Sequence, residues 1–145
     1  MSANGHRTVV VDASFAVKWL IPEPGSAQAI AHRVQWHQEH CIPVSPDFLL
    51  IELHNIFWKK LQRNEVKPTA AIFARGPTFG LNLNWFPFEP LLPQAWYVAC
   101  RHHISIYDAL YAALAQQLHA PLYTADAHLA KQLGSAVTVQ RLLSA

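Results

Sequence analysis

Short apolar runs alternate with longer stretches of helical periodicity along this chain of 145 residues. The three valines at residues 9–11 form a continuous β-branched run, which is typical of a strand buried in a parallel sheet. The pattern predicts strands at residues 9–11, 41–45, 83–88, 121–124 and 136–139. It predicts helices at residues 14–21, 26–40, 46–65, 68–75, 91–103, 106–119 and 127–133. We therefore expect an α/β fold, with residues 1–145 forming one domain around a mostly parallel sheet.

Four acidic residues lie in or just beyond these apolar stretches: Asp12, Glu52, Asp108 and Asp126. The chain has only nine Asp and Glu residues, so nearly half of its carboxylates lie against hydrophobic elements. Two follow predicted strands and two lie near the starts of predicted helices, so all four would meet at the carboxyl edge of the sheet. Carboxylates gathered there repel one another unless a cation lies between them, and Mg²⁺ or Mn²⁺ prefers oxygen ligands.

Each of these carboxylates also has a structural interpretation. The first and last are placed to cap the helices that follow them, and the third suits a first helical turn. Glu52 is expected in the second turn of its helix, where capping does not explain it. Ser14 and Thr124 lie beside the expected site. Their hydroxyl groups would bind a ligand or a substrate phosphate, or form local caps.

The formal net charge is +2, and it becomes +6 without the four acids, because 11 basic and 5 acidic residues remain. A basic surface around an acidic pocket suits a polyanionic substrate, although ordinary surface charge explains the same balance. The candidates for contacts with the backbone of such a substrate are Lys18, Lys59, Lys60, Arg63 and Lys131. For each of them alone, a solvated helix face is the simpler explanation.

The first helices carry surplus apolar residues, among them Phe15, Trp19 and Ile21. These would form a dimer interface or a groove for a protein partner. No apolar run approaches the roughly 20 residues that span a bilayer. Residues 1–8 are polar and lack the apolar segment of a signal peptide. We therefore expect a cytoplasmic protein that does not bind membranes.

Three stretches carry a resemblance to a known family. They are V-V-V-D-A-S-F-A-V-K-W-L-I-P-E-P from residue 9, P-D-F-L-L-I-E-L-H-N from residue 46, and I-S-I-Y-D-A-L-Y-A-A-L-A followed by L-Y-T-A-D-A-H-L-A from residues 104 and 122. Together they resemble the PIN-domain ribonucleases, and closely the VapC-like toxins of bacterial toxin–antitoxin pairs. The family's acidic quartet falls on Asp12, Glu52, Asp108 and Asp126, and its hydroxyl residues fall on Ser14 and Thr124. The resemblance implies a three-layer α/β/α sandwich, cleavage of RNA that depends on Mg²⁺ or Mn²⁺, a homodimer, and inhibition by a small antitoxin.

The leading hypothesis is a metal-dependent endoribonuclease. Asp12 and Asp108 would hold the first metal ion, and Glu52 and Asp126 would complete the site directly or through water. The alternative is a PIN-like module that binds RNA or a protein without cutting. A phosphatase of the haloacid-dehalogenase type also begins with an Asp after a strand. That chemistry needs a second Asp two residues later, where this chain has Ser14.

Overall fold

The computed structural model describes residues 6–67 and 81–142. Five strands form one sheet in the order β3-β2-β1-β4-β5, and every neighbouring pair is parallel. The strands are β1 (Thr8–Val11), β2 (Ile42–Pro46), β3 (Asn84–Phe86), β4 (Leu122–Thr124) and β5 (Val139–Arg141). The α/β fold predicted from the alternating pattern is confirmed, and the sheet is wholly parallel.

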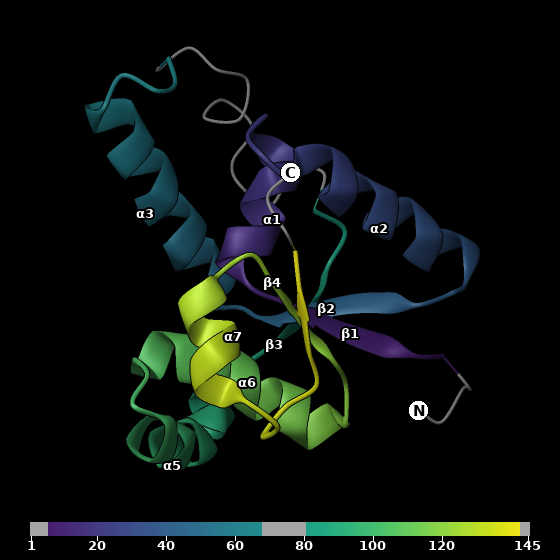
Figure 1. Ribbon diagram of the computed structural model, residues 1–145, viewed down its shortest axis with the longest axis vertical. Coiled ribbons are helices and arrows are strands. Elements are labelled where there is room, and N and C mark those ends of the chain that lie inside the picture. The colour runs from purple at the N-terminus through teal and green to yellow at the C-terminus, as the bar shows by residue number, and fades with distance from the viewer. Residues whose placement is uncertain (1–5, 68–80, 143–145) are drawn as a thin grey trace.

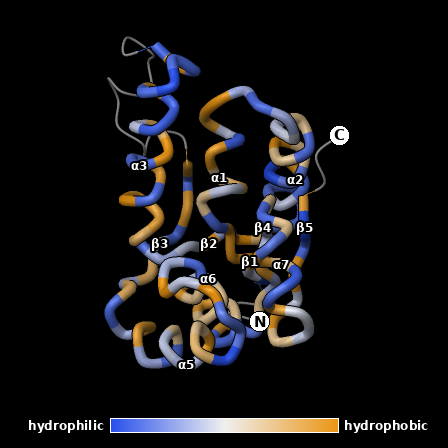
Figure 2. The backbone as a smooth tube through the Cα atoms, turned by 60° about the vertical axis from the view of Figure 1, so that its left-hand side comes forward, coloured by the Kyte–Doolittle hydropathy of each residue, from blue (hydrophilic) through white to orange (hydrophobic). Residues whose placement is uncertain are grey.

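Helices cover both faces of this sheet, with α1 and α2 on one side and α5 and α6 on the other (Figure 1). Helix α6 packs on β1, β2 and β4, and α5 packs on α6. Helix α3 leaves the sheet beside α1, and it is hydrophobic near its start and hydrophilic at its far end (Figure 2). The helices are α1 (Ala13–Leu20), α2 (Ser26–Gln38), α3 (Leu49–Gln62), α5 (Leu92–His102), α6 (Ile106–Leu118) and α7 (Ala127–Leu133), with the short 3-10 helix η1 (Glu89–Leu91).

The core is centred on β1 and α6. Val10 and Val11 are fully buried, and residues 109–115 of α6 are buried without interruption. Such a helix is apolar on all sides because the sheet covers one face and α5 covers another. Four of these seven residues are alanines, and small side chains let α6 lie close to its neighbours. This packing fixes the start of α6 at the carboxyl edge of the sheet.

Two predicted strands differ from the structure in instructive ways. The last strand was expected at residues 136–139 but lies at Val139–Arg141, because the turn that closes α7 occupies the preceding residues, with Ala136 N–H bonded to the Leu133 carbonyl. Pro43 was expected to weaken its strand or place it near an edge, yet β2 lies between β1 and β3. Pairing of β2 with β3 begins only at Val44, so the missing N–H of Pro43 costs no bond to β3.

The helix predicted at residues 68–75 lies outside the described residues. In the described part of the chain, no helix is both long and apolar enough to cross a bilayer.

Candidate functional site

Asp12 follows β1 directly, and its side chain is 4% exposed. One carboxylate oxygen, Oδ1, accepts a hydrogen bond from Phe15 N–H at 3.0 Å and another from the Ser14 hydroxyl at 2.7 Å. The other oxygen, Oδ2, accepts a bond from the Thr124 hydroxyl. Asp12 is therefore the N-cap of α1, as its structural interpretation predicted, and Thr124 also binds it from β4.

The two hydroxyl groups beside Asp12 are oriented by backbone groups of the β4–α7 connection. Ser14 Oγ accepts the N–H of Ala125 at 2.9 Å, and Thr124 Oγ1 accepts the N–H of Asp126 at 3.0 Å. Each hydroxyl has one proton, so each can then donate it to Asp12. The two hydroxyl oxygens lie 3.2 Å apart, but neither needs to donate to the other. This network joins the end of β1 to the end of β4.

Glu52 lies in the first turn of α3, not in the second turn as predicted. The prediction was wrong because β2 continues through Pro46 and the helix begins only at Leu49. The residue is partly buried, and its Oε1 atom is fully buried without a hydrogen-bond partner in the protein. A buried carboxylate oxygen without a partner is costly, so this atom is suited to receive a ligand.

Asp108 and Asp126 lie at the starts of the next two helices. Asp108 is in the first turn of α6, where the Ser105 hydroxyl caps the helix and accepts the Asp108 N–H at 3.1 Å. Asp126 is the N-cap of α7, and its Oδ1 accepts the N–H of Leu129 at 3.0 Å. Both structural interpretations therefore hold. A cap role does not exclude a functional role, since Asp108 acts electrostatically on Asp12 and Glu52, and Asp126 acts on Asp108.

Asp12, Glu52 and Asp108 lie within electrostatic range of one another, and Asp126 lies within range of Asp108. Burial raises the pKa of Asp12 to about 6 against the opposing hydrogen bonds, with a smaller contribution from Asp108. Burial also raises the pKa of Glu52 to about 7, and both Asp12 and Asp108 add to that shift. Burial raises the pKa of Asp108, and the charge of Asp126 raises it further. Asp12, Glu52 and Asp108 therefore hold their protons more tightly than they would in water.

A hard divalent cation fits this set of donors. All of the side-chain donors are oxygens, and one of them is a buried oxygen without a partner. In the described residues, however, no three His, Cys, Asp or Glu side chains are arranged to hold a metal ion as they stand. Side chains must turn, or water must bridge, before a cation is held. Sequence reasoning also missed Tyr111, one turn after Asp108 on α6 and buried beside Glu52.

The structure separates the five basic candidates for RNA contact. Lys18 and Lys60 both pair with Glu23, at 2.9 Å and 3.1 Å, and Lys60 also pairs with Glu65 at 3.3 Å, so these two lysines are balanced by two acidic residues. The alternative prediction, that these two lysines lie on solvated helix faces, was also wrong, because their side chains are only 11% and 20% exposed. The three that remain exposed are Lys59 and Arg63 on α3 and Lys131 on α7.

The expected apolar surface on the first helix does not exist. Phe15 is fully buried, Ile21 is 9% exposed, and Trp19 is partly buried with its ring N–H bonded to the Ala29 carbonyl. These side chains face α2 and the sheet because α1 is covered by its neighbours. Exposed apolar side chains occur elsewhere: Ile30 and Val34 on α2, Ile51 and Trp58 on α3, Phe88 before η1, Leu92, Trp96 and Tyr97 on α5, and Tyr107 on α6.

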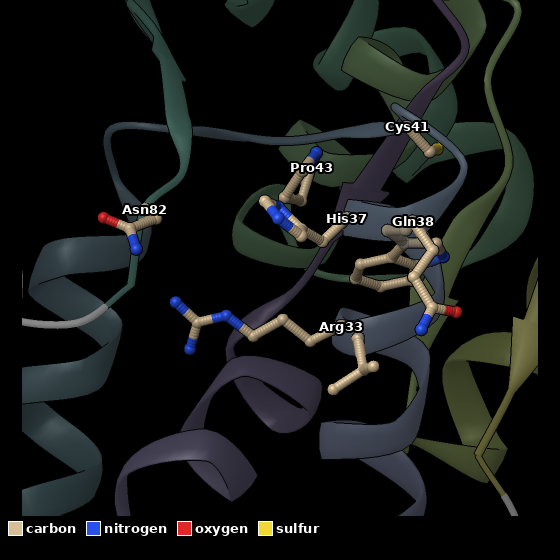
Figure 3. A pocket seen from close by; sticks show the side chains of 8 residues that line it. Arg33, His37, Gln38, Cys41, Pro43 and Asn82 are labelled. Atoms are coloured by element: carbon tan, nitrogen blue, oxygen red, sulfur yellow. The ribbon is translucent and has the colours of Figure 1, made fainter.

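A cavity of about 410 Å³ lies beside the second half of α2, away from the acidic cluster (Figure 3). Arg33 extends from α2 toward the segment that carries Asn82, and His37 lies near Pro43 (Figure 3). The Arg33 guanidinium bonds to the Leu81 carbonyl at 2.9 Å and lies over the Trp19 ring. Arg33 thus has a structural role at this cavity.

Comparison with known proteins gives a consistent result. The sequence matches the family described as PIN domain over residues 9–132. Ribonuclease VapC3 of Pyrobaculum aerophilum is 30% identical over 132 residues, which covers 90% of this chain and 98% of the relative. The crystal structure of PAE2754 from Pyrobaculum aerophilum has a TM-score of 0.65 at 24% identity and covers 91% of this chain and 90% of that one. A toxin–antitoxin complex from Klebsiella pneumoniae has a TM-score of 0.59 at 12% identity, covering 94% of this chain and 99% of that one. At these identities, the two structures show a shared fold.

Proposed function

This chain belongs to the PIN-domain family, and we propose that it is a VapC-like endoribonuclease that depends on Mg²⁺ or Mn²⁺ and acts as the toxin of a toxin–antitoxin pair. One observation supports the proposal: carboxylates from separate segments lie near the carboxyl edge of the parallel sheet, where Asp108 acts electrostatically on Asp12 and Glu52, and Asp126 acts on Asp108. A relative of 30% identity over nearly its whole length is a ribonuclease, which supports RNA as the substrate.

Asp12 and Asp108 would hold the first metal ion, and Glu52 and Asp126 would complete its surroundings directly or through water. When bound, such an ion supplies charge stabilisation at the phosphate and lowers the pKa of a coordinated water. The protein's own contribution is to fix the donors. Ser14 and Thr124 hold Asp12 through the hydrogen bonds described above. The starts of α6 and α7 bring the positive ends of two helix dipoles to the same edge, which favours bound negative charge.

The RNA backbone would approach over the exposed basic side chains of α3 and α7. Lys59 and Arg63 lie in or next to the last turn of α3, and Lys131 lies in the last turn of α7. Charges of this kind attract phosphates without reading sequence. Because RNA is the substrate, we propose the cytoplasm as the site of action.

Two protein partners are part of the proposal. A structural relative is a toxin–antitoxin complex, which supports a small antitoxin as a partner of this chain. We propose a homodimer formed through the apolar residues at η1 and α5. Leu92 and Trp96 lie one turn apart and are 36% and 66% exposed, so they form an apolar stripe on one face of α5.

The test of this function is the variant Asp108→Asn, which keeps the side-chain volume and removes one negative charge. We expect RNA cleavage in the presence of Mg²⁺ or Mn²⁺ to fall by about 100-fold or more, as for the loss of a group that acts at the reacting atoms. Folding should survive, because relief of like-charge repulsion offsets the loss of a first-turn acid.

The matched control is Glu89→Gln, since Glu89 is also a first-turn acid but is exposed and lies on η1. It should cleave RNA like the wild type. A folded Asp108→Asn protein with normal cleavage would remove Asp108 from the site. A wild type that binds RNA but never cuts it, with either ion or with EDTA, would favour the binding module.

A further inference from the structure

Two buried side-chain polar atoms lack a hydrogen-bond partner among the described residues, and both belong to the same contact. They are Oε1 of Glu52 and the hydroxyl oxygen of Tyr111. The two side chains face each other between α3 and α6, close enough that the Tyr111 hydroxyl lowers the pKa of Glu52. Neither atom makes a hydrogen bond as it stands. A hydrogen bond from the Tyr111 hydroxyl to Glu52 Oε1 would satisfy both atoms.

The Tyr111 ring is held firmly in place. The residue is 1% exposed, and its ring packs against Phe48 with centroids 6.4 Å apart. Tyr111 follows Asp108 by three residues on α6, so both side chains lie on the same face of that helix. The hydroxyl group also lies within electrostatic range of Asp12 and Asp108. A tyrosine hydroxyl has one proton, which it can donate to one of these carboxylates.

Packing alone does not explain a tyrosine at this position. A buried hydroxyl without a partner costs about 1–3 kcal/mol, and phenylalanine would fill the same space without that cost. The hydroxyl group therefore points to a role beyond the core. The group that it reaches is the one carboxylate of the site with a buried, unsatisfied oxygen.

We propose that Tyr111 is a positioning residue of the acidic site, whose hydroxyl donates to Glu52 and holds that carboxylate toward Asp12 and Asp108. This inference rests on the proposed function, since the contact between Tyr111 and Glu52 would serve the binding of a cation. Groups that orient a metal ligand in this way typically change metal affinity by about 10- to 100-fold when they are removed. Tyr111 would do so without touching the cation or the RNA.

The experiment compares Tyr111→Phe with Tyr107→Phe. Both tyrosines lie on α6 and both pack against Phe48, with Tyr107 stacked at 5.1 Å, but Tyr107 is 60% exposed whereas Tyr111 is 1% exposed. Mn²⁺ binding is measured by calorimetry at neutral pH, together with the melting temperature without metal. We expect Tyr111→Phe to weaken Mn²⁺ binding about tenfold without lowering the melting temperature, and Tyr107→Phe to change neither quantity.

A double-mutant cycle with Glu52→Gln separates positioning from general packing. If Tyr111 acts through Glu52, then Tyr111→Phe should cause no further loss of Mn²⁺ affinity in the Glu52→Gln background. An equal loss in both backgrounds would overturn the inference, as would wild-type affinity in a folded Tyr111→Phe protein. Absence of Mn²⁺ binding by the wild type would instead overturn the proposed function, and the inference with it.

Discussion

At the scale of single residues, Asp12 combines a helix cap with a place in the acidic site. Its oxygens accept bonds from two hydroxyl groups and one backbone N–H, and these bonds partly offset the cost of burying its charge. The pKa of Asp12 nevertheless stays raised, at about 6. The bonds are worth most when the carboxylate is ionised, because hydrogen bonds to charged groups are the stronger ones. Their contribution should therefore depend on pH.

The variant Thr124→Val tests this dependence. It keeps the β-branched shape but removes the donor to Asp12 and the acceptor for Asp126 N–H. We expect a loss of about 1–3 kcal/mol in the free energy of unfolding near pH 8, and a smaller loss near pH 5, where Asp12 is largely protonated. Denaturant titrations at the two pH values measure it. Thr8→Val, at the start of β1, is the control, and an equal loss at both pH values would show that the ionised carboxylate is not involved.

The sequence predicts the identity of these residues better than their contacts. Asp12, Ser14 and Thr124 stand out because they follow apolar strands, which is a local signal. The Ser14 hydroxyl is oriented by the Ala125 N–H, and the Thr124 hydroxyl binds Asp12, in both cases across more than 100 residues of the chain, so no local pattern reveals these contacts. No role was predicted for Tyr111 for a similar reason, because its helical spacing indicates a core position. Only the nearby Glu52 indicates a role for its hydroxyl group.

At the scale of elements, ion pairs of Glu23 link the turn between α1 and α2 to helix α3. Lys18 of α1 and Lys60 of α3 bind its two carboxylate oxygens, and all three side chains are at most 20% exposed. Burial alone would raise the pKa of Glu23, but the bonds to both lysines hold it below its ordinary value. Charges that are paired and shielded in this way resist screening by salt better than exposed pairs do.

Glu23→Gln should loosen this attachment. We expect a loss of about 1–3 kcal/mol in the free energy of unfolding at neutral pH, because two lysines lose the carboxylate that they share. The loss should fade as pH drops through the pKa of Glu23, where the wild type also loses the charge. The control is Glu65→Gln, since Glu65 is 44% exposed and pairs with Lys60 at 3.3 Å. If the two variants prove equally stable, the Glu23 contacts contribute no more to the free energy of unfolding than an exposed ion pair does.

The element boundaries show which parts of the fold local sequence patterns can predict. The strand at β1 and the helix α6 were predicted closely, because their apolar patterns are strong and their burial is nearly complete. The start of α3 was missed by three residues, since pairing with β3 extends β2 through Pro46. That contact joins segments about forty residues apart, and it overrides the proline's suitability for a first helical turn.

At the scale of the whole molecule, the acidic site lowers stability in the absence of a cation. The pKa values of Asp12 and Glu52 are about 6 and 7, and that of Asp108 is also raised. Between about pH 4 and 7 the unfolded chain therefore loses protons that the folded protein keeps. It follows that the free energy of unfolding falls as pH rises through this window, by an amount on the order of a few kcal/mol.

We therefore expect the metal-free protein to melt at a higher temperature near pH 5 than near pH 8, and Mg²⁺ or Mn²⁺ to raise the melting temperature more at the higher pH. Calorimetric scans with EDTA or with either ion at the two pH values test this. Glu52→Gln should flatten the dependence on pH, because it removes the group with the highest of these pKa values. A metal-free melting temperature that rises from pH 5 to pH 8 would contradict the account.

The central position of β1 has a further consequence for synthesis on the ribosome. Asp12 emerges early, but its partner strand β4 and the last carboxylate, Asp126, are translated more than a hundred residues later. Until then β1 lacks a neighbour on one side, and Asp12 lacks the Thr124 hydroxyl. A nascent or prematurely terminated chain therefore has no assembled acidic cluster. The topology of the sheet therefore delays assembly of the acidic cluster until β4 and Asp126 have been translated.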